Sequence, residues 1–150
     1  MLKLFNPKSN AAPNGAYSHG VIVPANARWL YLSGQTGTRP DGSIPQTVEE
    51  QTEAVWRNIL GVLAEAGMKV TDIVKITSFL TRHEDFAKFV PIRAKYLGAH
   101  RPASTSLIVS ALAKPEFLVE VEAVAAKAAA PAKPAARARR RPAKMKKRSR

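Results

Sequence analysis

Hydroxyl, imidazole and carboxylate side chains are the groups in this sequence that could perform catalysis. The stretch "RPASTS" (residues 101–106) puts three hydroxyls before an apolar run, but it has neither the glycine context nor the following helix of a serine-hydrolase nucleophile. His19, His83 and His100 stand singly, without metal-ligand spacing, and cysteine is absent. We therefore expect no metal site and no cofactor.

The segment "VEVEA" (residues 119–123) offers a pair of carboxylates. If it is a strand, alternation places Glu120 and Glu122 on one face and the apolar side chains on the other. The pair could simply lie on a solvated sheet face. Alternatively, one glutamate could act as a general acid/base, provided that this face lines a cleft.

The elements in the first half of the chain follow from turns and periodicity. "GVIV" (20–23) and "RWLYLSG" (28–34) are rich in β-formers and flank the turn-like "PANA", which predicts a β-hairpin. "GQTGTRPDG" is predicted to be a loop, since it lacks the lysine of a phosphate-binding loop. A helix is expected over residues 47–66, because Thr47 and Glu50 form a capping box and Gly67 supplies a stop.

The second half repeats the alternation of strand and helix. Strands are expected at 72–80, 105–112 and 117–125, and a helix within 83–98. Pro91 should delay the start of that helix or kink it. The order strand, strand, helix, strand, helix, strand, strand predicts an α+β fold with two helices packed on one face of a mixed sheet.

The positive charge is concentrated at the C-terminus. Of the 24 Lys and Arg residues, 11 lie in residues 126–150, which contain none of the 11 acidic residues, so residues 1–125 have a net charge of +2. We predict a globular domain over 1–125 and a disordered Ala/Pro/Lys/Arg-rich tail over 126–150.

Such a tail could bind nucleic acid non-specifically through phosphate contacts, or merely aid solubility. Prolines interrupt any amphipathic helix in it, which argues against a membrane partner. The chain shows no apolar span or secretory leader, and the lack of cysteine is typical of a reducing compartment. We expect a cytoplasmic protein.

Seven motifs follow one another as in a known family. They are "NAAPNGAYSHG", "LYLSGQTG", the helix with Asn58 and Leu63, "VKITSFLT", "EDF", "RPA" and "VEVEAVA". In this order they resemble the Rid family, whose best-known members are 2-iminobutanoate/2-iminopropanoate deaminases. The resemblance implies a chorismate-mutase-like fold, a homotrimer and a small-molecule pocket at each subunit interface.

The resemblance also implies roles for individual residues. Tyr17 matches the pocket tyrosine, and Ser33 with Gly34 matches the loop that contacts the substrate. Glu120 matches the glutamate that positions or activates the attacking water. A semi-buried carboxylate suits imine hydrolysis, because the reaction needs an oriented water and proton transfer to nitrogen.

Three positions depart from the deaminase pattern. Deaminase members read Pro-Ala-Arg where this chain has Ser104, and that arginine holds the substrate carboxylate. A pocket asparagine aligns with Val90, and a pocket cysteine aligns with Ser106. Arg93 lies three residues after Val90 on the same predicted helix face, so its guanidinium could replace the missing anchor.

The expected function is therefore the binding or hydrolysis of a small imine, enamine or related metabolite. The alternatives are a pocket that binds metabolites without catalysis, and a nucleic-acid-associated protein acting through the tail. Some family members are labelled endoribonucleases, but no histidine pair of the kind used for RNA cleavage is present.

Overall fold

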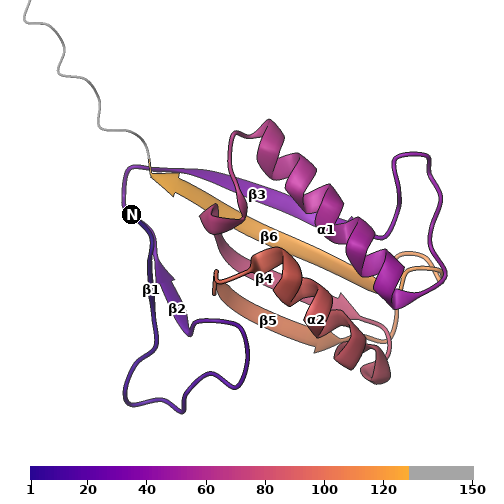
Figure 1. Cartoon of the computed structure of the whole chain (residues 1–150), viewed down its shortest axis with the longest axis horizontal. Helices are drawn as coiled ribbons and strands as arrows, with labels where there is room; N and C mark the ends of the chain where they lie inside the picture. Colours follow the sequence, from indigo (N-terminus) through magenta and orange to yellow (C-terminus); the bar gives the residue numbers. More distant parts are fainter. Residues whose placement is uncertain (129–150) are drawn as a thin grey trace, which may run out of the picture.

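The computed structural model describes residues 1–128 as a four-stranded sheet with two helices on one face and a small two-stranded sheet beside it (Figure 1). Most of the predicted tail lies outside the described residues. The elements in chain order are β1 (Lys3–Phe5), β2 (Gly20–Ile22), β3 (Ala27–Thr36), α1 (Val48–Glu65), η1 (Val70–Asp72), β4 (Ile73–Leu80), η2 (His83–Asp85), α2 (Phe86–Leu97), β5 (Ala103–Ile108) and β6 (Val119–Ala128).

The large sheet is mixed, as predicted. Its strand order is β3-β6-β4-β5, in which β4 and β5 run parallel and the other neighbours run antiparallel. The parallel pair is joined through α2, which packs back on the sheet as crossover helices do. The α+β architecture and the placement of both helices on one face are confirmed.

The predicted hairpin between residues 20–23 and 28–34 is wrong. β2 pairs with β1, with Phe5 opposite Gly20, whereas β3 pairs with β6 at the far end of the described chain. Gly20 accommodates this pairing, because a Cβ there would lie 2.6 Å from the Phe5 ring. A turn between two β-rich runs does not determine which strands pair, and here non-local partners replace the local one.

The first helix forms as its sequence predicts. Thr47 is its N-cap, and the Thr47 Oγ1 accepts a bond from the Glu50 backbone N–H at 3.3 Å. Gly67 ends the helical region with a φ of 64°, a conformation that favours glycine. The helix buries Trp56, Ile59 and other apolar side chains against the sheet.

The second helix starts after a short 3-10 turn and contains Pro91 in its interior. Its buried side chains are Phe89, Arg93 and Leu97, one turn apart along a single face. Gly98 is the C-cap, with a φ of 55°. An arginine therefore shares the buried face of this helix with two large apolar residues.

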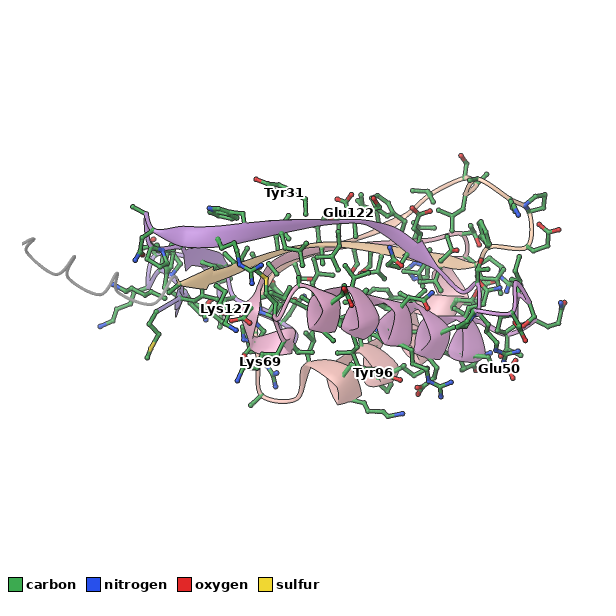
Figure 2. The ribbon with its side chains drawn as sticks, turned by 90° about the horizontal axis from the view of Figure 1, so that it is seen from above. Tyr31, Glu50, Lys69, Tyr96, Glu122 and Lys127 are labelled. Atoms are coloured by element: carbon green, nitrogen blue, oxygen red, sulfur yellow. The ribbon has the colours of Figure 1, made fainter. Side chains whose placement is uncertain are left out.

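The opposite side of the large sheet carries no helix, and we call it the open face. Along β6, Val119 and Val121 are buried beneath the helices, so Glu120 and Glu122 point to the open face, as alternation predicts. Figure 2 shows Glu122 and Tyr31 on this side, away from both helices. The exposed rings of Trp29 and Tyr31 stack here, with centroids 6.4 Å apart.

The last two strands are displaced from their predicted bounds. β5 begins at Ala103, so Ser104 lies inside a strand and not in the turn before it. β6 runs to Ala128, so residues 126–128, which the composition predicts to belong to the tail, pair with β3. Within residues 1–128 no helix is both long and apolar enough to cross a membrane.

Candidate functional site

A pocket of about 370 Å³ lies between α2, β5 and the loop that precedes β2. This volume falls in the range of small-molecule sites. Its lining residues are Asn14, Gly15, Ala16, Tyr17, Phe86, Val90, Arg93, Ser104 and Ser106. The structure therefore brings together, in one cavity, the predicted residues Tyr17, Val90, Arg93, Ser104 and Ser106.

Arg93 is the charged group of this pocket, and only 7% of its surface is exposed. Its guanidinium donates to Ser104 Oγ at 3.1 Å and to the Ala16 carbonyl at 2.9 Å. Both acceptors are neutral, and no carboxylate of residues 1–128 forms a salt bridge with Arg93. Burial lowers the pKa of Arg93, and the positive charge of Arg101 adds to this effect.

A buried cation without an acidic partner is costly, since its neutral hydrogen bonds offset only part of the lost hydration. An anion entering the pocket would supply the missing countercharge. The guanidinium geometry suits a carboxylate in particular, because its parallel N–H groups match two oxygens. The electrostatics of this pocket thus favour a small carboxylate.

The loop that carries Tyr17 is fixed to the sheet by backbone contacts. Ser18 donates its N–H to the Pro102 carbonyl at 3.2 Å and forms a bridge with Ala103. The Tyr17 hydroxyl donates to Asn14 Oδ1 at 3.3 Å. This attachment holds the half-buried tyrosine ring at the pocket wall beside β5.

Sequence reasoning missed part of this lining, namely residues 14–16 and Phe86. A signal for Phe86 was present, because Phe86, Val90 and Arg93 follow the i, i+4, i+7 spacing of one helix face. Phe86 and Val90 are each 37% exposed, which is unusual for core residues and consistent with an open pocket wall. The loop contribution has no such periodicity, since it depends on contacts with residues far along the chain.

The remaining predicted residues form a second group on the open face. Ser33 and Gly34 lie at a bulge in β3, where the pairing with β6 shifts register. Gly34 packs directly against Glu120: a Cβ at residue 34 would overlap the carboxylate and lie 2.7 Å from its Cδ. Ser33, Gly34 and Glu120 do not line the Arg93 pocket, so within one chain the predicted site is divided between two faces of the sheet.

Candidate metal ligands do not gather anywhere in residues 1–128, where no group of three or more His, Asp or Glu side chains is close enough to hold an ion. The groups present at the two predicted sites are a guanidinium, hydroxyls and a carboxylate. These groups can bind an organic anion, orient water and transfer protons.

The family model described as Endoribonuclease L-PSP matches residues 8–127. The chain belongs to this family. Among its relatives, a RutC family protein of Pyrococcus abyssi is 37% identical over 117 residues, which covers 77% of this chain and 89% of that protein.

Two further similar proteins connect the chain with the Rid proteins. A 2-iminobutanoate/2-iminopropanoate deaminase of Rattus norvegicus is 33% identical over 125 residues, covering 82% of this chain and 88% of that protein. The crystal structure of a Rid family protein from Yersinia pestis has a TM-score of 0.74 at 31% identity, covering 83% of this chain and 97% of that chain. The Rid resemblance and the chorismate-mutase-like fold are confirmed.

Proposed function

We propose that this protein binds small 2-imino acids or their enamine tautomers and hydrolyses the C=N bond to a 2-keto acid and ammonia. The observation that carries the proposal is the buried, acid-free Arg93 in a pocket of ligand size. The named activity of the rat relative is the deamination of 2-iminobutanoate and 2-iminopropanoate. Each of these substrates carries a carboxylate, the group that Arg93 is suited to bind.

Arg93 takes the place of the arginine that deaminase members carry after Pro-Ala. Ser104 occupies that position here, and its hydroxyl accepts a hydrogen bond from Arg93. In this chain the positive charge therefore comes from α2, whereas in deaminase members it comes from the position of Ser104 on β5. In both cases the substrate anion meets a guanidinium beside that position. A charge-assisted pair of this kind contributes on the order of 2–4 kcal/mol, or roughly 30- to 1000-fold in binding.

The site is proposed to be completed by a second copy of the chain in a homotrimer. Arg93 and Glu120 lie on opposite faces of one sheet, so the open face of a neighbouring copy would supply the carboxylate. The exposed Trp29 and Tyr31 support association through that face, since stacked aromatic rings are typical of protein interfaces. Glu122, which shares the face, would support the contact between copies.

In the proposed reaction, Glu120 accepts a proton from water as the oxygen attacks the imine carbon. The same proton is passed to nitrogen, which gives a tetrahedral amino alcohol. Glu120 then carries the proton of the new hydroxyl to the nitrogen as the C–N bond breaks, so that the nitrogen leaves as ammonia and the keto acid remains. One water is consumed and the net proton count is unchanged.

The first experiment generates 2-iminobutanoate in situ with a dehydratase and follows its disappearance with wild-type protein, Arg93→Ala and Glu120→Gln. Wild-type protein should accelerate hydrolysis. Arg93→Ala should lower kcat/KM by roughly 30- to 1000-fold, and Glu120→Gln should lower kcat at preserved substrate binding. A wild-type protein that binds the imino acid without hydrolysing it would instead establish the non-catalytic alternative.

A mixing experiment tests the shared site. Arg93→Ala and Glu120→Gln chains are unfolded together, refolded and assayed. Each site is assumed to take Arg93 from one copy and Glu120 from another. In a 1:1 mixture the chance that both contributed residues are wild type is one half times one half, so about one quarter of the wild-type activity should return. Each variant refolded alone is the control, and a mixture no more active than these controls would place both groups in the same copy.

A further inference from the structure

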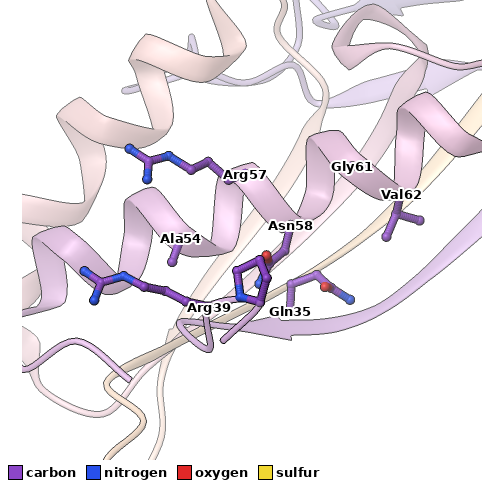
Figure 3. A pocket seen from close by; sticks show the side chains of 8 residues that line it. Gln35, Arg39, Ala54, Arg57, Asn58, Gly61 and Val62 are labelled. Atoms are coloured by element: carbon purple, nitrogen blue, oxygen red, sulfur yellow. The ribbon is translucent and has the colours of Figure 1, made fainter. Parts of the chain in front are cut away.

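A second hollow, of about 540 Å³, lies between α1 and the segment that follows β3 (Figure 3). It lies at the β3 edge of the large sheet, whereas the Arg93 pocket lies at the β5 edge. The residues that line the second hollow are Gln35, Arg39, Pro40, Ala54, Arg57, Asn58, Gly61 and Val62. None of them lines the Arg93 pocket. The hollow therefore needs an explanation separate from the proposed imine chemistry.

The wall of this hollow is fixed in place. Asn58 Nδ2 donates to the carbonyls of Thr36 at 3.2 Å and Thr38 at 3.0 Å, which ties the segment to α1. Gly37 packs so closely that a Cβ there would lie 2.6 Å from Gln51 Cγ. The segment that follows β3 ends in a turn, in which the Gly42 N–H donates to the Arg39 carbonyl at 2.9 Å. The cavity is thus preformed and does not need to be opened by a ligand.

Gly61 keeps the floor of the hollow open. It lies within α1, where glycine costs about 1 kcal/mol relative to alanine. No packing contact explains it, because a Cβ at this position would meet no atom within 4 Å. The missing side chain leaves free space beside the apolar groups of Ala54 and Val62. A flat, partly apolar molecule can occupy that space.

The two arginines at the rim carry charge that the surrounding acids do not fully balance. Figure 3 shows Arg39 and Arg57 extending toward the same end of the hollow, with Gln35 and Val62 toward the other. The guanidinium of Arg39 meets the Glu50 carboxylate only at 3.8 Å, and both side chains are about half exposed, so the attraction is weak. Arg57 forms no salt bridge within residues 1–128. Its charge helps to lower the pKa of Glu53, but the two Glu53 oxygens already accept bonds from Lys95 and Tyr96.

Two side-chain amides of the hollow, those of Gln35 and Asn58, use their N–H groups within the protein and leave their oxygens as acceptors. Gln35 Nε2 donates to the Ser33 carbonyl at 3.0 Å, and Asn58 Nδ2 is used as described above. Within the described residues, nothing donates to Gln35 Oε1 or Asn58 Oδ1. These amide oxygens can each accept a bond from an N–H or O–H group of a ligand.

We propose that this hollow binds a phosphomonoester with a flat body that carries N–H donors, as a nucleoside monophosphate does. A phosphomonoester has a charge of about −1.5 to −2 at neutral pH, which matches two guanidinium groups better than a carboxylate would. The flat body lies over Gly61, and its donors reach the amide oxygens. This site is independent of Arg93 and Glu120.

The test is calorimetric titration of the full-length chain with adenosine monophosphate at about 0.15 M salt, where long-range attraction to the basic C-terminus is screened. Wild-type protein should bind one nucleotide per chain, at least about tenfold tighter than adenosine or inorganic phosphate alone. Arg39→Glu and Arg57→Glu should each weaken binding by about tenfold or more. Gly61→Leu should abolish it while leaving the fold intact, because the added side chain enters open space.

Two control variants define where the nucleotide binds. Lys69→Glu makes the same charge change on an exposed residue outside the hollow and should leave binding unchanged. Arg93→Ala should also leave it unchanged. The proposal is overturned if Gly61→Leu still binds the nucleotide, if Arg93→Ala loses it, or if inorganic phosphate binds equally well.

Discussion

The contact between Gly34 and Glu120 gives a sharp test of the proposed catalytic carboxylate. Gly34 has no positive φ, so alanine can adopt its backbone conformation. The added methyl group, however, would lie 2.7 Å from Glu120 Cδ, whereas ordinary van der Waals contact begins at 3.4 Å. The carboxyl group must therefore move by roughly 0.7 Å or more, and a displacement near 1 Å in a catalytic group costs on the order of 100-fold in rate.

We expect Gly34→Ala to lower kcat for 2-iminobutanoate hydrolysis by about 100-fold with little change in thermal stability, because the flexible end of Glu120 can yield. The assay is the coupled imine hydrolysis described above, with circular dichroism melting as the check on folding. Gly61→Ala is the matched control, since its added methyl group meets no atom within 4 Å.

A double-mutant cycle decides whether the effect acts through Glu120. The residual rate of Glu120→Gln no longer depends on the carboxylate. In that background, Gly34→Ala should therefore lower kcat by less than about threefold. An equal loss in both backgrounds would refute the reasoning, because it would show that Gly34 contributes to catalysis by some route other than the position of Glu120.

Further predictions concern stability and are tested by urea unfolding. Thr47→Ala removes the N-cap of α1 and should lower the free energy of unfolding by about 1 kcal/mol. Gly61→Ala should raise it by up to about 1 kcal/mol, whereas Gly67→Ala should lower it, because residue 67 has a φ of 64°. Glu53 accepts bonds from Lys95 and Tyr96, and the Lys95 bond is the main cause that lowers the pKa of Glu53. The ionised Glu53 therefore stabilises the fold fully above the ordinary glutamate pKa, and this stabilisation is lost as the pH falls through the lowered pKa. The free energies of unfolding of wild type and Glu53→Gln should differ most near neutral pH and converge in acid.

The helices and the central strands could be predicted from the sequence because their signals are local. The capping pair at Thr47 and Glu50, and the glycines at 67 and 98, set the helix ends close to where the structure has them. Pairing partners could not be predicted in the same way. β3 is followed closely by a helix in the chain, yet it bonds to β6, and nothing in residues 20–34 indicates that partner.

The candidate site was predictable in its residues but not in its arrangement. Helical spacing placed Arg93 on the same face as Val90, and the structure brings both into one pocket. Whether an arginine on that face would be exposed or buried depends on the loop at residue 16 and on Ser104, which contact it from distant parts of the chain. The division of the predicted residues between two faces likewise depends on strand pairing.

The position of β6 has a consequence for synthesis on the ribosome. This strand lies between β3 and β4 in the large sheet, although it is the last of the described elements to be made. Until it emerges, β3 has no neighbour in that sheet and β4 has only β5. The nascent chain therefore presents unpaired strand edges for most of its translation, the state in which chaperones and aggregation compete. We expect the sheet to close in a single late step, when residues 119–128 insert and join its two halves.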